Sequence, residues 1–97
     1  QIGEVATISK RGVKEWLNQP FFDIQAKNEA LLDLQNLIES SRCCGSGVDK
    51  HMPTAALTLF ETKIKNHKSW IIVRRFHNGK SIIWSVSDNP SILDMVQ

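Results

Sequence analysis

Two apolar runs near the C-terminus, residues 70–77 and 80–86, are joined by Asn78 and Gly79. Asn-Gly is the pair most typical of a two-residue type I′ turn, because both central residues of that turn need a positive φ. The runs are rich in the β-branched and aromatic side chains that favour strands. This pattern predicts a β-hairpin, and the rest of the chain must pack against it.

The turn also determines which residues of the hairpin lie opposite each other. If Asn78 and Gly79 form the whole turn, the facing pairs are His77 and Lys80, Arg75 and Ile82, Val73 and Trp84, and Ile71 and Val86. Because side chains alternate across a strand, one face of the hairpin is assigned to the core. That face holds Ile71, Val73, Ile82, Trp84 and Val86.

The opposite face of the hairpin is too apolar for an ordinary solvent face. It holds Trp70, Ile72, Arg74, Phe76 and Ile83. Three coverings fit this composition: the C-terminal tail (residues 91–96, expected as one helical turn), a third strand at residues 5–8, or a second subunit. In a further alternative, the aromatic side chains stack on the exposed bases of a single strand.

Two helices are expected before residue 45. Ser9 is a suitable N-cap for a short helix over residues 10–17, and Pro20 ends it because the residue before a proline avoids the α region. Asp23 is a suitable N-cap for a longer amphipathic helix from Ile24 to about Ser41. Its apolar stripe includes Lys27, together with Leu31, Leu34 and Ile38.

The segment after Pro53 has two interpretations. Proline suits the first position of a helix, and a helix from Pro53 to about Asn66 places a wholly polar stripe on one side. The competing interpretation is a strand from Ala55 to Ile64, since Thr58, Phe60 and Thr62 also suit a pleated surface. We adopt the helix as the expectation.

Taken together, these elements predict an α+β fold of three helices followed by a C-terminal β-hairpin. This order is similar to that of winged-helix domains, in which the third helix enters the major groove and the hairpin contacts phosphate or the minor groove. The long second helix and the lack of a short strand between the first and second helices depart from that pattern. No Pro/Gly/Ser-rich linker divides the chain, so we expect a single domain over residues 1–97. A chain that begins at Gln1 is expected to be excised from a larger protein.

Charge is unevenly distributed along the sequence. Residues 1–48 hold five basic and six acidic residues, whereas residues 49–97 hold seven and four. No acidic residue lies between Glu61 and Asp88. A basic segment of this kind is typical of a surface that meets a phosphate backbone. The candidate nucleic-acid-binding residues are Thr58, Thr62, Lys65, Lys68, Arg74, Arg75, His77 and Lys80.

The functional expectation is a winged-helix-like domain that binds nucleic acid, DNA rather than RNA, and acts in regulation inside the cell, in the nucleus or cytoplasm. The alternative is a protein-interaction or homodimerisation module that uses the face of Trp70, Ile72, Phe76 and Ile83. Surface lysines that serve only solubility or edge protection would explain the charge equally well.

Other classes of function have weaker support in the sequence. No nucleophile accompanies a histidine and a carboxylate in a recognisable order, and Gly45-Ser46-Gly47 lacks the spacing and the lysine of a phosphate loop. The adjacent Cys43 and Cys44 lack the paired spacing of zinc ligands that His51, His67 or His77 would complete. We therefore expect no catalysis, no cofactor, no metal and no membrane span.

Overall fold

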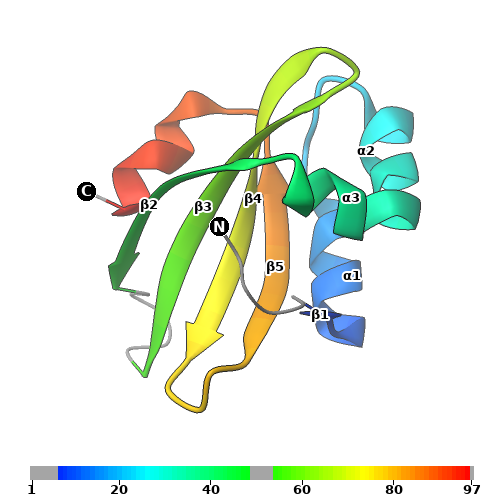
Figure 1. The fold of residues 1–97 in the computed structure, drawn as a ribbon. Coiled ribbons are helices and arrows are strands. Elements are labelled where there is room, and N and C mark those ends of the chain that lie inside the picture. The colour runs from blue at the N-terminus through cyan, green and yellow to red at the C-terminus, as the bar shows by residue number, and fades with distance from the viewer. Residues whose placement is uncertain (1–6, 49–53, 97) are drawn as a thin grey trace.

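Across the residues that the structure describes, 7–48 and 54–96, five strands form a mixed sheet in the order β1-β5-β4-β3-β2. This computed structural model places β1 (Thr7–Ile8) parallel to β5, and the other neighbouring strands are antiparallel (Figure 1). The longer strands are β2 (Arg42–Val48), β3 (Ala55–Ile64), β4 (His67–Phe76) and β5 (Ser81–Ser87).

The first two helices begin at the positions that their N-cap residues indicate. The Ser9 hydroxyl accepts a hydrogen bond from Gly12 N at 3.1 Å at the start of α1 (Lys10–Asn18), and Asp23 Oδ1 accepts one from Ala26 N at 3.0 Å at the start of α2. The expected long helix is not continuous. It is divided into α2 (Ile24–Ala30), a 3₁₀ turn η1 (Leu31–Asp33) and α3 (Leu34–Glu39).

The division has an identifiable cause in the hydrogen-bond ladder. The carbonyl of Lys27, which Leu31 N would bond in a continuous helix, accepts the indole N–H of Trp16 at 2.8 Å. Leu31 N instead donates to the carbonyl of Asn28, three residues back. A side chain inserted in this way tightens the helix locally and redirects its axis.

The expected third helix, Pro53 to Asn66, is wrong, and so is the winged-helix-like order of three helices followed by a hairpin. Residues 55–64 form β3, as in the competing interpretation, while Pro53 lies outside the described residues. β3 lies between β2 and β4 and is covered on both faces. A strand buried on both sides does not alternate between apolar and polar residues, so its period of two is hidden in the sequence.

The hairpin itself is confirmed, although part of its register differs. Phe76 N donates to Lys80 O, so three residues rather than two form the turn, with Gly79 at φ +88°. The pairs nearest the turn therefore shift by one, and Val73 faces Ile83 instead of Trp84. A bulge beyond Val73 restores the expected pairing of Ile71 with Val86.

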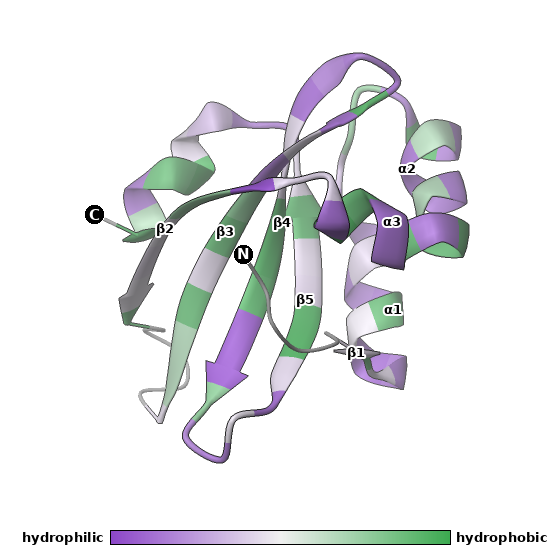
Figure 2. Ribbon diagram, in the orientation of Figure 1, coloured by the Kyte–Doolittle hydropathy of each residue, from purple (hydrophilic) through white to green (hydrophobic). Residues whose placement is uncertain are grey.

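This shift exchanges side chains between the two faces of the sheet. Ile83, not Ile82 or Trp84, joins Ile71, Val73 and Val86 in the cluster under α1–α3. On the other face, Leu57, Leu59 and Ile72 form a second cluster beneath the C-terminal 3₁₀ segment η2 (Pro90–Val96). Figure 2 shows the apolar stretches of the strands between these coverings. The tail is thus the covering of the second apolar face.

Candidate nucleic-acid interface

The structure divides the eight predicted binding residues into three groups. Thr58 and Thr62 are buried in β3, with exposed fractions of 4% and 8%, and the Thr58 hydroxyl shares a hydrogen bond of 3.0 Å with that of Ser46. Lys65 and Lys68 lie at the β3–β4 turn, at one end of the sheet. The other four, Arg74, Arg75, His77 and Lys80, lie at the β4–β5 turn, at the other end.

The two ends are well separated. Lys68 and Arg75 are seven residues apart on β4, or roughly 23 Å at the rise of an extended strand. Figure 1 shows the β3–β4 turn beside α2 and the β4–β5 turn at the far end of the sheet. The eight residues therefore do not form a single surface in this fold.

The end at the β3–β4 turn, with Lys63, Lys65, His67 and Lys68, is not uniformly basic. Lys65 Nζ lies 2.6 Å from Asp23 Oδ2, and this hydrogen bond, with a second one from Ala26 N, holds the pKa of Asp23 below its ordinary value. The same hydrogen bond raises the pKa of Lys65. His67 stacks against Phe22, with ring centroids 4.1 Å apart. Part of the charge at this end is therefore compensated locally.

The end at the β4–β5 turn gains basic residues that are not among the eight predicted ones. β1 pairs with Ile82 and Ile83 of β5, so α1 starts beside the beginning of β5 (Figure 1). The first half of α1 then adds three exposed side chains to the hairpin residues. We call this region the basic end; it comprises Lys10, Arg11, Lys14, Arg74, Arg75, His77 and Lys80.

Trp84 joins the two parts of the basic end. The guanidinium carbon of Arg74 lies 4.1 Å from the centroid of the indole, and that of Arg11 lies 5.6 Å from it. Arg74 is 7% exposed and Trp84 is half-buried, whereas Arg11 is exposed. Contacts of a cation with an indole face are worth about 0.5–2 kcal/mol each, depending on solvation. The ring therefore holds two positive charges, from α1 and β4, at one place.

Acidic residues are absent from the described segments that build this end. Residues 7–14, 42–48, 54–60 and 62–87 contain none. Glu15, Glu61 and Asp88 directly follow these segments. The carboxylate of Glu15 accepts a hydrogen bond from Gln19, the C-cap of α1. These segments therefore supply positive charge without a carboxylate of their own.

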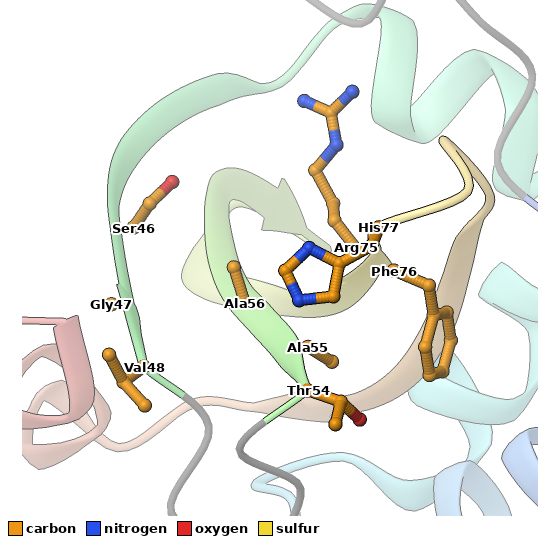
Figure 3. A pocket seen from close by; sticks show the side chains of 9 residues that line it. All are labelled: Ser46, Gly47, Val48, Thr54, Ala55, Ala56, Arg75, Phe76 and His77. Carbon is orange, nitrogen blue, oxygen red and sulfur yellow. The ribbon is translucent and has the colours of Figure 1, made fainter.

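A hollow of about 490 Å³ adjoins the basic end, between the last residues of β2, the start of β3 and the end of β4. Figure 3 shows Ser46, Gly47 and Val48 of β2 on one side, and Arg75, Phe76 and His77 on the other, with Ala55 and Ala56 of β3 between them. Two other hollows are lined by both signs of charge, with Asp23, Glu29 and Lys65 in one, and Arg42, Glu61 and Lys63 in the other. Among the described residues that line the hollow beside the basic end, none is acidic.

The cysteines and histidines considered as metal ligands are dispersed. Cys43 and Cys44 lie on β2, His67 and His77 lie at opposite ends of β4, and His51 falls outside the described residues. Burial, followed by the charge of Glu61, raises the pKa of the Cys44 thiol, which disfavours the thiolate. Within residues 7–48 and 54–96, no three His, Cys, Asp or Glu side chains are grouped so that they could hold a metal ion.

One signal for the basic residues of α1 was present in the sequence. Lys10, Arg11 and Lys14 lie at the start of the first predicted helix, and residues 5–14 contain no acidic residue. Their proximity to the hairpin depends on the parallel pairing of a two-residue strand, which local patterns do not indicate.

Among the described residues, no helix is both long and apolar enough to cross a membrane.

Comparisons with known proteins give one assignment. No curated protein and no solved structure matched the chain. The model of one family, the large polyvalent protein-associated domain 3, matches residues 1–84, which run from the N-terminus into β5. The match covers most of the chain, and the protein belongs to the family of the large polyvalent protein-associated domain 3.

Proposed function

We propose that this protein is a nucleic-acid-binding module that contacts the phosphate backbone through its basic end. The observation that carries the proposal is the position of Arg11 and Arg74 on the same indole, Trp84. This contact brings the basic start of α1 to the basic end of the hairpin. The proposal replaces the helix-in-groove mode expected from the sequence, because the segment assigned to the reading helix is the strand β3.

The arrangement suits a polyanion because the charges come from separate elements and lie at one end of the sheet. Lys10, Arg11, Lys14 and Lys80 are exposed, so each can approach a phosphate without a change in the fold. Arg74 is buried against Trp84 and contributes through its field rather than by direct contact. Phosphate contacts of this kind give affinity and orientation but little sequence preference.

The family assignment supports a role as one part of a larger protein. Its name associates these domains with large polyvalent proteins. A module that holds a nucleic acid by charge alone would act by bringing the other parts of such a protein to the same ligand. This proposal concerns binding and assigns no catalytic step to the chain.

The alternative function, a partner surface formed by Trp70, Ile72, Phe76 and Ile83, has less support. Trp70, Ile72 and Ile83 are 2%, 6% and 2% exposed in the isolated chain. Ile83 packs under the helices, whereas Ile72 packs under η2, so the residues do not share a face. A partner would have to displace η2 to reach Ile72.

A titration with labelled nucleic acid at two salt concentrations tests the proposal. Four exposed cationic side chains of the basic end, Lys10, Arg11, Lys14 and Lys80, set the expected number of phosphate contacts. With about four contacts, counterion release predicts that affinity falls by about 10²-fold between about 50 mM and about 200 mM salt. The absence of binding at low salt, or an affinity that does not change with salt, would contradict the proposal.

A further inference from the structure

We infer that the hollow between β2, β3 and β4 accepts an unpaired nucleobase, and that the ligand of the basic end is therefore single-stranded. The inference rests on the proposed function, since it concerns the kind of nucleic acid held there. It goes beyond that function because phosphate contacts alone do not distinguish a single strand from a duplex.

The floor of the hollow is formed by the small side chain of Ala56, which lies between two larger residues in a row that runs across three strands. Val48, Ala56 and Arg75 are neighbours in the registers of β2 with β3 and of β3 with β4. All three are exposed, so α1–α3 do not cover this corner of the sheet. Because the central residue of the row is alanine, the residues on either side stand above it and leave a depression.

The walls supply the groups that hold a planar, polar ring. Arg75, at the end of β4, and His77, in the β4–β5 turn, are exposed on one side, with Thr54 just before β3 and Ser46 on β2 (Figure 3). Guanidinium and imidazole planes stack on bases, and hydroxyl groups bond to base edges in either direction. The apolar contribution comes from Val48, Ala55, Ala56 and Phe76. This mixture of a few polar groups on an apolar lining is typical of sites for small ring compounds.

The size of the hollow and the positive charge beside it favour a nucleobase as its occupant. About 490 Å³ lies within the range of small-molecule sites, and a base attached to its sugar fills a large part of it. His77 of the β4–β5 turn and Arg75 at the end of β4 line the hollow, so the phosphates on either side of an inserted base would meet the basic end. A base inside a duplex is stacked and paired, and it reaches such a hollow only after it has been extruded at a cost of a few kcal/mol.

The test combines a comparison of ligands with a charge-neutral variant. Wild-type protein is titrated with a labelled single strand of about 12 nucleotides and with the duplex of the same sequence, at the same low salt. The expected result is an affinity for the single strand that is about tenfold or more above that for the duplex. Equal affinities, or tighter binding of the duplex, would overturn the inference and leave the proposed function standing.

The variant Ala56→Trp fills the hollow without changing any charge. Because Ala56 is exposed, the ring occupies solvent and not the core. The affinity for the single strand is expected to fall about tenfold, the range associated with the loss of one stacked base, while that for the duplex stays the same. The control Ser91→Trp adds the same ring at an exposed position of η2, outside the lining of the hollow. Single-strand affinity that is unchanged in Ala56→Trp, or reduced equally in the control, would overturn the inference.

The two proposals fail in different ways. Loss of salt dependence, or insensitivity to charge reversal at the basic end, rejects nucleic-acid binding as a whole. Salt-dependent binding without a preference for single strands rejects only the assignment of the hollow.

Discussion

Trp16 of α1 and Lys27 of α2 link the two helices through reciprocal hydrogen bonds, in which each side chain donates to main-chain carbonyls of the other helix or its C-cap. The indole Nε1 of Trp16 donates to the carbonyl of Lys27 at 2.8 Å. In return, Lys27 Nζ donates to the carbonyls of Leu17 and Gln19 at the end of α1, at 3.0 and 2.7 Å. Both residues are fully buried. A lysine on the apolar stripe of α2 thus serves as the C-terminal cap of α1, where a cation is also favoured by the helix dipole.

Replacement of this lysine is expected to destabilise the fold. Lys27→Met keeps the length of the side chain but leaves the carbonyls of Leu17 and Gln19 without their donor. The unfolding free energy should fall by about 1–3 kcal/mol, the cost typical of buried polar groups left without a partner. Urea denaturation measures it, and the exposed Lys14→Met is the control, with a change within about 0.5 kcal/mol. An unaltered stability in Lys27→Met would show that the two carbonyls do not need the ammonium group.

The pH dependence of the same variant tests the environment of the amine. Burial lowers the pKa of Lys27 below its ordinary value. In the pH range between the lowered and the ordinary pKa, the unfolded chain binds more protons at this residue than the folded chain, so folding gains stability as pH rises. The stability difference between wild type and Lys27→Met should therefore increase with rising pH over the range just below the ordinary pKa of lysine, about 10.4. A constant difference over this range would contradict a lowered pKa.

Replacement of Gly12 by alanine is expected to destabilise the protein, although helix propensity favours alanine. Alanine is worth about 1 kcal/mol more than glycine inside a helix. At this position, however, a Cβ would lie 2.7 Å from the carbonyl oxygen of Ile83 and 3.0 Å from Ile8 Cγ1. The clashing oxygen of Ile83 belongs to the main chain and cannot rotate away, so α1 must move away from β5. Gly12→Ala should therefore lower the unfolding free energy by about 1–3 kcal/mol. Thermal denaturation measures it; a gain in stability would show that α1 can shift on the sheet without cost.

The β3–β4 turn offers a test of backbone conformation. Lys65 and Asn66 both have positive φ, 54° and 62°, as a type I′ hairpin requires. Asparagine tolerates this region, whereas a β-branched residue loses about 1–2 kcal/mol there. Asn66→Val should therefore cost about that much in denaturation experiments, while Asn66→Gly, at the same exposed site, should change stability by about 0.5 kcal/mol or less. Equal effects of the two substitutions would contradict this turn type.

Local chemistry made part of this fold predictable. The starts of α1 and α2 were predicted because Ser9 and Asp23 are capping residues, and the structure shows both caps formed. The hairpin followed from Asn78-Gly79, although the turn holds one residue more and a bulge compensates for it. Whether a hairpin has two or three residues in its turn depends on how the strands twist in the complete sheet, which the local sequence does not specify.

The rest depended on contacts between distant segments. β3 was assigned to a helix because both of its faces are buried, which removes the alternation that identifies a strand. Lys65-Asn66 was included in that helix, although it forms the turn between β3 and β4. For the same reason the predicted binding set combined two ends of the sheet and omitted Arg11, whose place beside Trp84 follows from the parallel pairing of β1 with β5.

We propose that nucleic acid binds at the basic end and not at the opposite end of the same sheet. Two double variants with the same change in net charge compare the ends directly: Arg11→Glu with Lys80→Glu, and Lys63→Glu with Lys68→Glu. All four residues are exposed, and Lys63 and Lys68 face each other across β3 and β4 near the opposite turn. Far-UV circular dichroism and thermal denaturation check that each variant is folded.

The decisive measurement is the affinity of each double variant for the same labelled single strand at about 50 mM salt. We expect Arg11→Glu with Lys80→Glu to lower affinity by about tenfold or more and to reduce the slope of its salt dependence by about one to two units. We expect Lys63→Glu with Lys68→Glu to have a several-fold smaller effect. Equal losses in the two variants, or a larger loss at Lys63 and Lys68, would contradict the placement of the ligand at the basic end.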